Sequence, residues 1–162
     1  MNADAFRHVY EYHFAENRKI WNHVLALSDE QFTQPIDYSL GSVKNHVVHM
    51  LSVDEVWFSG LRGVELAEFF EPEQFPNREA IRAQWDKVEH TMRDYLANLR
   101  DETLFAKPFP KGEDENLTVW PVLLQVINHG TDHRAQLLRI LHDFGLDTRY
   151  QDYIFYVYEH MV

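Results

Sequence analysis

Hydrophobic residues recur every three to four positions along four long segments of this 162-residue chain. This spacing is typical of one apolar face of an α-helix, and no segment shows the strict alternation of a half-buried β-strand. The four segments span about residues 4–27, 43–61, 77–99 and 118–144. Four helices of about five to seven turns each predict an all-α fold, a four-helix bundle.

Local start and stop signals agree with these boundaries. The first N–H groups of a helix have no partner within the helix. A short polar side chain that accepts a hydrogen bond from one of them is therefore favoured at a helix start. The predicted N-caps are Asp4, Ser42, Asn77 and Thr118. Gly145 follows the last segment, as expected where a helix ends. Residues 28–32 predict a cap and one further helical turn, which Pro35 stops.

The remaining stretches predict connections and a short tail. Residues 65–75 are acidic and aromatic and contain Pro72, so they predict a connector. Residues 107–116, flanked and interrupted by Pro and Gly, predict an exposed loop. A short amphipathic segment at 150–160 closes the chain. We expect the bundle to form a single domain over residues 1–162.

Composition narrows the function classes. The formal net charge is −11, from 15 basic and 26 acidic residues, and no basic cluster offsets it. An acidic surface repels phosphate backbones, so we expect no nucleic-acid partner. The absence of cysteine excludes disulfides, a Cys nucleophile and Cys-ligated metal sites. No apolar run is long enough for a membrane span and no leader pattern is present, so a cytoplasmic location is expected.

The strongest chemical signal is a pair of histidines four residues apart. His129 and His133 lie in an apolar run of the last long segment. Positions i and i+4 share a helix face and lie within about 6 Å of each other. Two imidazoles there can bind one metal ion. Because the chain has ten histidines, the spacing alone is weak evidence.

A third ligand could come from the segment at 43–61, which contains His46 and His49. At about 100° per residue, His46 lies about 60–80° from the centre of the apolar face. His49 lies about 120–140° away, on its margin. Burial therefore favours His46, whereas a site at the bundle edge would suit His49. The angles alone do not decide whether His46 or His49 is the third ligand.

Two stretches resemble the DinB/YfiT-like superfamily of four-helix bundle metalloproteins. The first is the Ser-initiated stretch 41–50, followed by Trp57 eight residues after His49. The second is the stretch 128–136, in which two His at i and i+4 precede Arg, a small residue and Gln. Ala135 stands where the family usually has Gly. Helix order and loop placement agree along essentially the whole chain, and residues 141–146 and the aromatic tail also fit.

Matching by position from Ser42, the resemblance implies that the metal-binding histidine of the second helix is His49. His46 falls where the family usually has an apolar residue. The implied centre is His49, His129 and His133, completed by water. Nitrogen ligands without thiolate suit zinc or nickel as first choices, with iron or manganese as further candidates. Open water positions are typical of catalytic rather than closed structural sites.

Further side chains are candidates for contacts around the metal. Ligand histidines usually donate their other ring N–H to an acceptor, and Asp54 and Asp132 are the predicted acceptors. Gln136, one turn past His133, is a candidate for contacting a bound water or ligand. Arg134 is interpreted as a packing or ion-pair residue, and His13 as an ordinary half-buried histidine. No sequence pattern identifies a catalytic residue.

Two function classes follow from the resemblance. One is a metal-dependent enzyme, a thiol S-transferase or a hydrolase, in which a low-molecular-weight thiol or hydroxide attacks an electrophile. The alternative is a non-catalytic, stress-induced module for metal binding and dimerisation. Many relatives are homodimers, and a homodimer is expected here too. The aromatic residues proposed for its interface are Phe58, Phe69, Phe70 and Phe75.

Overall fold

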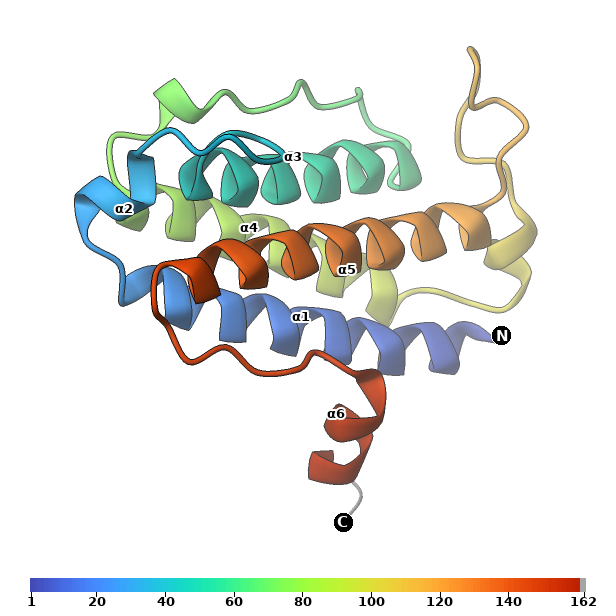
Figure 1. Ribbon diagram of the computed structural model, residues 1–162. Helices are drawn as coiled ribbons and strands as arrows, with labels where there is room; N and C mark the ends of the chain where they lie inside the picture. Colours follow the sequence, from blue (N-terminus) through green and yellow to red (C-terminus); the bar gives the residue numbers. More distant parts are fainter. Residues whose placement is uncertain (161–162) are drawn as a thin grey trace.

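Four long helices lie side by side in the structure, a computed structural model that describes residues 1–160 (Figure 1). They are α1 (Ala3–Leu25), α3 (Val43–Leu61), α4 (Arg78–Ala97) and α5 (Val119–Asp143). Helices α1 and α5 run in one direction and α3 and α4 in the other. The described residues contain no β-strand, so the all-α four-helix bundle predicted from the periodicity is confirmed.

Shorter elements join these helices. Helix α2 (Asp29–Thr33) is the predicted single turn, and two 3₁₀ turns follow at Pro72–Gln74 and Glu102–Phe105. The connector after α3 runs back along the length of that helix, which lets α4 start at the same end of the bundle as α3 (Figure 1). The loop at 107–116 projects beyond the start of α5 as predicted, and only turns occur in it.

The helix starts follow the predicted caps with two differences. Ser42 Oγ accepts a hydrogen bond from the Asn45 N–H at 3.0 Å, and Asn77 Oδ1 accepts one from the Ala80 N–H at 2.9 Å. Helix α1, however, is capped by Asn2, so the prediction for Asp4 was wrong. Asp4 lies in the first turn instead, where its charge favours the helix N-terminus. Thr118 occupies the N-cap position of α5 without a side-chain cap hydrogen bond.

The apolar faces of the four helices meet in one core. Its largest fully buried side chains come from all four helices and include Phe14, Phe58, Trp85 and Leu123. Burying a large apolar side chain contributes roughly 1.5–3 kcal/mol, so this core stabilises the bundle independently of any ligand. None of the described helices combines the length and the apolar composition needed to cross a membrane.

Helix α6 (Tyr153–His160) stands apart from the bundle and packs beside α1 through few residues (Figure 1). Its buried residue is Tyr156, whose ring contacts the rings of Tyr12 and His8. The segment before it is held by Gln151, which donates to the Thr131 carbonyl oxygen at 3.1 Å and accepts from Arg134 at 2.9 Å. Residues 150–158 leave several aromatic side chains exposed.

Candidate metal centre

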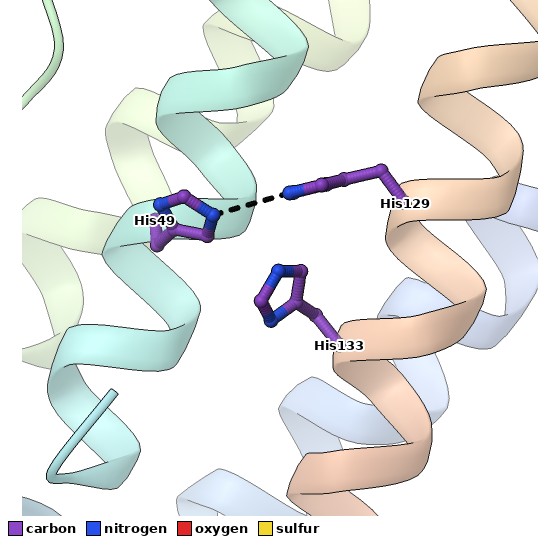
Figure 2. A group of neighbouring side chains, drawn as sticks. All are labelled: His49, His129 and His133. Carbon is purple, nitrogen blue, oxygen red and sulfur yellow. Dashed lines mark hydrogen bonds between the residues drawn. The ribbon is translucent and has the colours of Figure 1, made fainter. Parts of the chain in front are cut away.

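Three histidines from two helices converge on one point of the structure. His49 of α3 and His129 and His133 of α5 each offer a ring nitrogen, and these three atoms lie within 4.8 Å of one another. The Nε2 atoms of His49 and His129 are 3.1 Å apart. Figure 2 shows the imidazole rings of this His cluster facing one another across the gap between the two helices. The rings are half-buried, so the cluster lies at the edge of the bundle.

The geometry of the His cluster follows from local helix structure and from close helix packing. His129 and His133 are one turn apart on α5, and their ring centroids are 4.3 Å apart. Between them Gly130 faces α1, where a Cβ atom would come within 2.5 Å of His13 Cε1. The glycine therefore lets α5 pack closely against α1 while the two histidines point toward α3.

The imidazoles of the His cluster are held in their neutral form. Burial, together with the nearby His133 and His49, lowers the pKa of His129 to about 4. Burial likewise lowers the pKa values of His49 and His133. Loss of water disfavours the charged form of a histidine, so each ring keeps a free lone pair at neutral pH. Three neutral imidazoles with converging lone pairs are a donor set suited to a divalent transition metal.

The other ring nitrogens of the α5 histidines support this assignment. His129 Nδ1 and His133 Nδ1 are buried and have no hydrogen-bond partner. Buried polar atoms without a partner are rare and costly in folded proteins. These two nitrogens fit imidazole rings that bind a metal ion. In such a ring one nitrogen binds the ion, and the nitrogen facing away carries a proton that it donates to an acceptor or a water molecule.

The two carboxylates predicted as these acceptors make their closest contacts with other side chains. Asp54 is nearly fully buried, and its Oδ2 is 3.6 Å from His13 Nε2. Five residues separate it from His49, which places it about 140° around α3, on the side facing α1. Asp132 is exposed and accepts a hydrogen bond from Gln136 Nε2 at 3.1 Å, and its negative charge raises the pKa of His129 and His133, against the effect of burial.

Gln136 lies three residues after His133 on α5, and a hydrogen bond from its side chain raises the pKa of that histidine, against the effect of burial. Besides its bond to Asp132, its Oε1 accepts a hydrogen bond from the hydroxyl of Ser39. Ser39 lies in the loop before α3 and has a φ of 51°, which is unusual for a residue other than glycine. The side-chain amide of Gln136 is therefore committed to protein partners in this structure.

Phe69 lies beside the His cluster, although the sequence patterns did not point to it as a site residue. Its ring stacks on His49 at a centroid distance of 6.4 Å and an interplanar angle of 11°. Phe69 is 54% exposed, so it presents an apolar surface next to His49. No periodic signal could have found it, because it belongs to the irregular connector after α3.

His46 is fully buried and lies outside the His cluster. Its Nδ1 is 2.8 Å from the Ser42 carbonyl oxygen, and its ring centroid is 6.1 Å from that of His133. The burial estimate from the helical angles was thus right about His46 facing inward. The three-histidine group instead contains the marginal His49, as the resemblance implied.

A second polar group lies on the opposite side of α5, and the sequence patterns underestimated it. His13, which was interpreted as half-buried, is fully buried and contacts Asn17, Asp54 and Arg134. We call these four residues the buried network. The sequence did contain a signal for this network, because the polar residues His13, Asn17 and Asp54 occupy positions within the apolar faces of their helices. Arg134 is a buried packing residue, as interpreted.

Comparison with known proteins agrees with the resemblance along the whole chain. The sequence model of the DinB family matches residues 1–160. The curated protein named Protein DinB from Bacillus subtilis (strain 168) is 26% identical over 167 residues. That alignment covers 98% of this chain and 96% of the relative.

Proposed function

Because this chain belongs to the DinB family and brings three neutral imidazoles together, we propose that it binds a divalent metal ion through His49, His129 and His133. The observation that carries the proposal is the placement of one ring nitrogen from each residue within 4.8 Å of the others. An all-nitrogen set of neutral ligands suits zinc or nickel first, and iron or manganese next.

We further propose that the centre is catalytic and acts as a thiol S-transferase or a hydrolase. When bound, a divalent ion with three protein ligands would supply a Lewis acid that favours a thiolate or hydroxide nucleophile at neutral pH. Beside it, Phe69 offers an apolar surface next to His49, and Gln136 interacts with His133. A low-molecular-weight thiol is the proposed ligand, since a cation without anionic protein ligands attracts a small anion.

The first test is the metal content of protein purified without an affinity tag, measured by mass spectrometry of the elements. Wild type is expected to hold about one ion per chain. His49→Ala, His129→Ala and His133→Ala should each fall well below that value. His142→Ala, at an exposed position of the same helix, is the matched control and should keep the ion. If His46→Ala loses the ion while His49→Ala keeps it, the ligand on α3 is misassigned.

A second experiment separates catalysis from simple binding. Cobalt-substituted protein titrated with small thiols should change its visible spectrum if the thiolate reaches the ion, and chelation should abolish the change. Thiol-transfer and hydrolysis assays with the metal present then follow. A spectrum that does not respond at millimolar thiol, together with no turnover, would favour the non-catalytic, stress-induced module. Tight, salt-sensitive DNA binding would contradict the proposed absence of a nucleic-acid partner.

We also propose that the protein acts in the cytoplasm as a homodimer, with an interface that differs from the one expected from sequence. Phe58 and Phe75 are buried in the bundle and are unavailable for a partner, whereas Phe69 is exposed. The exposed aromatic residues gather in the C-terminal segment, at Tyr150, Tyr153, Phe155 and Tyr158. Light scattering should give twice the chain mass at tens of micromolar, and Phe155→Ser with Tyr158→Ser should weaken the dimer.

A further inference from the structure

Two buried ring nitrogens without hydrogen-bond partners belong to neighbouring histidines. They are His46 Nε2 on α3 and His133 Nδ1 on α5. The two rings are in an edge-to-face arrangement, with an interplanar angle of 68°. One unsatisfied buried nitrogen costs stability, and two in adjacent side chains indicate a shared partner.

The hydrogen bond on the far side of His46 determines what its free nitrogen can do. His46 Nδ1 lies 2.8 Å from the Ser42 carbonyl oxygen, which can only accept a hydrogen bond. The proton of a neutral His46 is therefore on Nδ1, and Nε2 keeps its lone pair as an acceptor. Because Ser42 is the N-cap residue of α3, this hydrogen bond also fixes the ring to the start of the helix.

The hydrogen-bond donor that could pair with His46 Nε2 is on His133. Figure 2 shows one ring nitrogen of His133 facing the other two imidazoles and the second pointing away from them. If the facing nitrogen binds an ion, the proton of the neutral ring is on the nitrogen that points away. That nitrogen, Nδ1, is then a buried donor without an acceptor.

The distance between the two rings determines whether His46 Nε2 and His133 Nδ1 can bond directly or only through a bridging molecule. Their centroids are 6.1 Å apart, which is too far for a direct hydrogen bond of about 2.9 Å between ring nitrogens. One water molecule can span this gap, accepting from His133 Nδ1 and donating to His46 Nε2. Gln136 is the alternative partner, since a hydrogen bond from its side chain raises the pKa of His133, against the effect of burial, and its amide also bonds to Ser39 and Asp132.

We infer that His46 is a positioning residue for the third metal ligand: through one buried water it accepts the Nδ1 proton of His133 and holds that ring toward the ion. This inference rests on the proposed metal-binding function. It assigns His46 a role outside the ligand set, because its Nδ1 is bonded to the Ser42 carbonyl and it is not part of the His cluster. A partner of this kind fixes the orientation of the ligand ring and raises its basicity.

The test is zinc affinity, measured by competition with a chromogenic chelator, for wild type, His46→Leu and His46→Gln. Leucine removes the acceptor while filling a similar volume, and we expect zinc affinity to fall by about 10- to 100-fold. Glutamine restores a polar acceptor and should recover most of the affinity. The visible spectrum of the cobalt-substituted protein should shift in His46→Leu and return toward wild type in His46→Gln. His142→Leu, an exposed change on α5, is the matched control.

Thermal unfolding of the metal-free variants separates positioning from simple packing. His46→Leu removes the partnerless Nε2 but also the Nδ1 hydrogen bond to the Ser42 carbonyl, and these two effects on stability oppose each other, so the apo protein should melt close to the wild-type temperature. Lower zinc affinity without lower apo stability supports the inference. Unchanged zinc affinity and an unchanged cobalt spectrum in His46→Leu overturn it while the metal site stands. A wild type that binds no ion overturns the proposed function itself.

A crystal structure of the zinc-loaded wild type provides a readout that does not depend on any variant folding. A water molecule within hydrogen-bond distance of both His133 Nδ1 and His46 Nε2 is the expected result. Direct binding of the ion by His46, or an apolar contact between the two rings without water, contradicts the inference.

Discussion

Helix α5 separates two histidine-containing groups that are built in opposite ways. On one side the His cluster of His49, His129 and His133 leaves two buried ring nitrogens without partners. On the other side, in the buried network, Arg134 Nη1 lies 3.3 Å from His13 Nδ1 and the carboxylate of Asp54 lies 3.6 Å from His13 Nε2. The comparison teaches that burial and polarity alone do not mark a functional site. What differs between the two groups is the unsatisfied hydrogen-bonding capacity of the His cluster, which is the difference expected between a group that binds a ligand and a group that supports the fold.

The buried network is satisfied at every guanidinium nitrogen of Arg134. Its Nη1 donates to Asn17 Oδ1 at 2.9 Å, its Nε to Gln151 at 2.9 Å and its Nη2 to Thr131 at 3.0 Å. Burial lowers the pKa of Arg134, and the nearby hydroxyl of Tyr12 and carboxylates of Glu16 and Asp54 oppose that change. The side chain thus joins α1, α5 and the C-terminal segment, so we expect the network to contribute stability and the His cluster to contribute metal binding.

The largest expected effect is on the buried network. Arg134→Leu removes the donors of four hydrogen bonds and leaves the buried carboxylate of Asp54 without its nearby positive charge, at a cost of about 3–5 kcal/mol in the free energy of unfolding. Urea unfolding of the apo protein measures the loss. His129→Ala, the matched change on the other face, should cost far less while abolishing metal binding. A similar loss of stability in both variants would remove the distinction between the two groups.

The next effect concerns the close packing that separates the two groups. Gly130→Ala places a Cβ atom 2.5 Å from His13 Cε1, so the ring or the helix must move. Overpacking of this kind costs about 1–3 kcal/mol, again measured by urea unfolding. In the His13→Ala background the same substitution should cost clearly less, because the closest atom, His13 Cε1, is absent and the flexible side chain of Arg134, with Nη1 at 3.0 Å, is the neighbour that remains. Equal costs in both backgrounds would show that the contact does not limit the packing of α5 on α1.

A smaller effect is expected from pH. The pKa of His129 is lowered to about 4, so between pH 6.5 and 4 the unfolded chain binds a proton that the folded apo protein does not. The stability tied to the neutral ring is complete above pH 6.5 and is lost as the pH falls through that interval. His129→Gln should therefore flatten the pH dependence of apo stability, measured by urea unfolding at several pH values. Parallel profiles for wild type and variant would contradict the lowered pKa.

The smallest effect is expected at the exposed edge of the His cluster. Ser39→Ala removes the hydroxyl that bonds to Gln136, which costs about 1 kcal/mol or less in the free energy of unfolding because the residue is exposed. Zinc affinity should change less than in His46→Leu. His142→Leu, the exposed change on α5, is the control, whereas Asp132→Asn would keep an acceptor for Gln136 Nε2 but remove a charge that acts on the two α5 histidines of the His cluster. A large loss of zinc affinity in Ser39→Ala would place this loop in direct control of the metal centre.

The helices and one half of the candidate site could be predicted from the sequence because both depend on neighbouring residues. The repeat of apolar positions and the caps at Ser42 and Asn77 define α3 and α4 within a few residues. His129 and His133 are one turn apart on one helix, so their shared face follows from helix geometry alone. The same geometry left His46 and His49 open, and the resemblance to the DinB family was needed to select His49.

The sequence by itself therefore determined the helical segments, the fold class and the paired histidines of α5. Only the tertiary structure decided that His49 comes within 3.1 Å of His129, that Asp54 points to His13, and that His46 lies behind His133. These relations depend on how α3, α5 and α1 are rotated and packed against each other. Helical periodicity defines one face of each helix, but the close packing of large side chains across the core determines which residues of different helices meet.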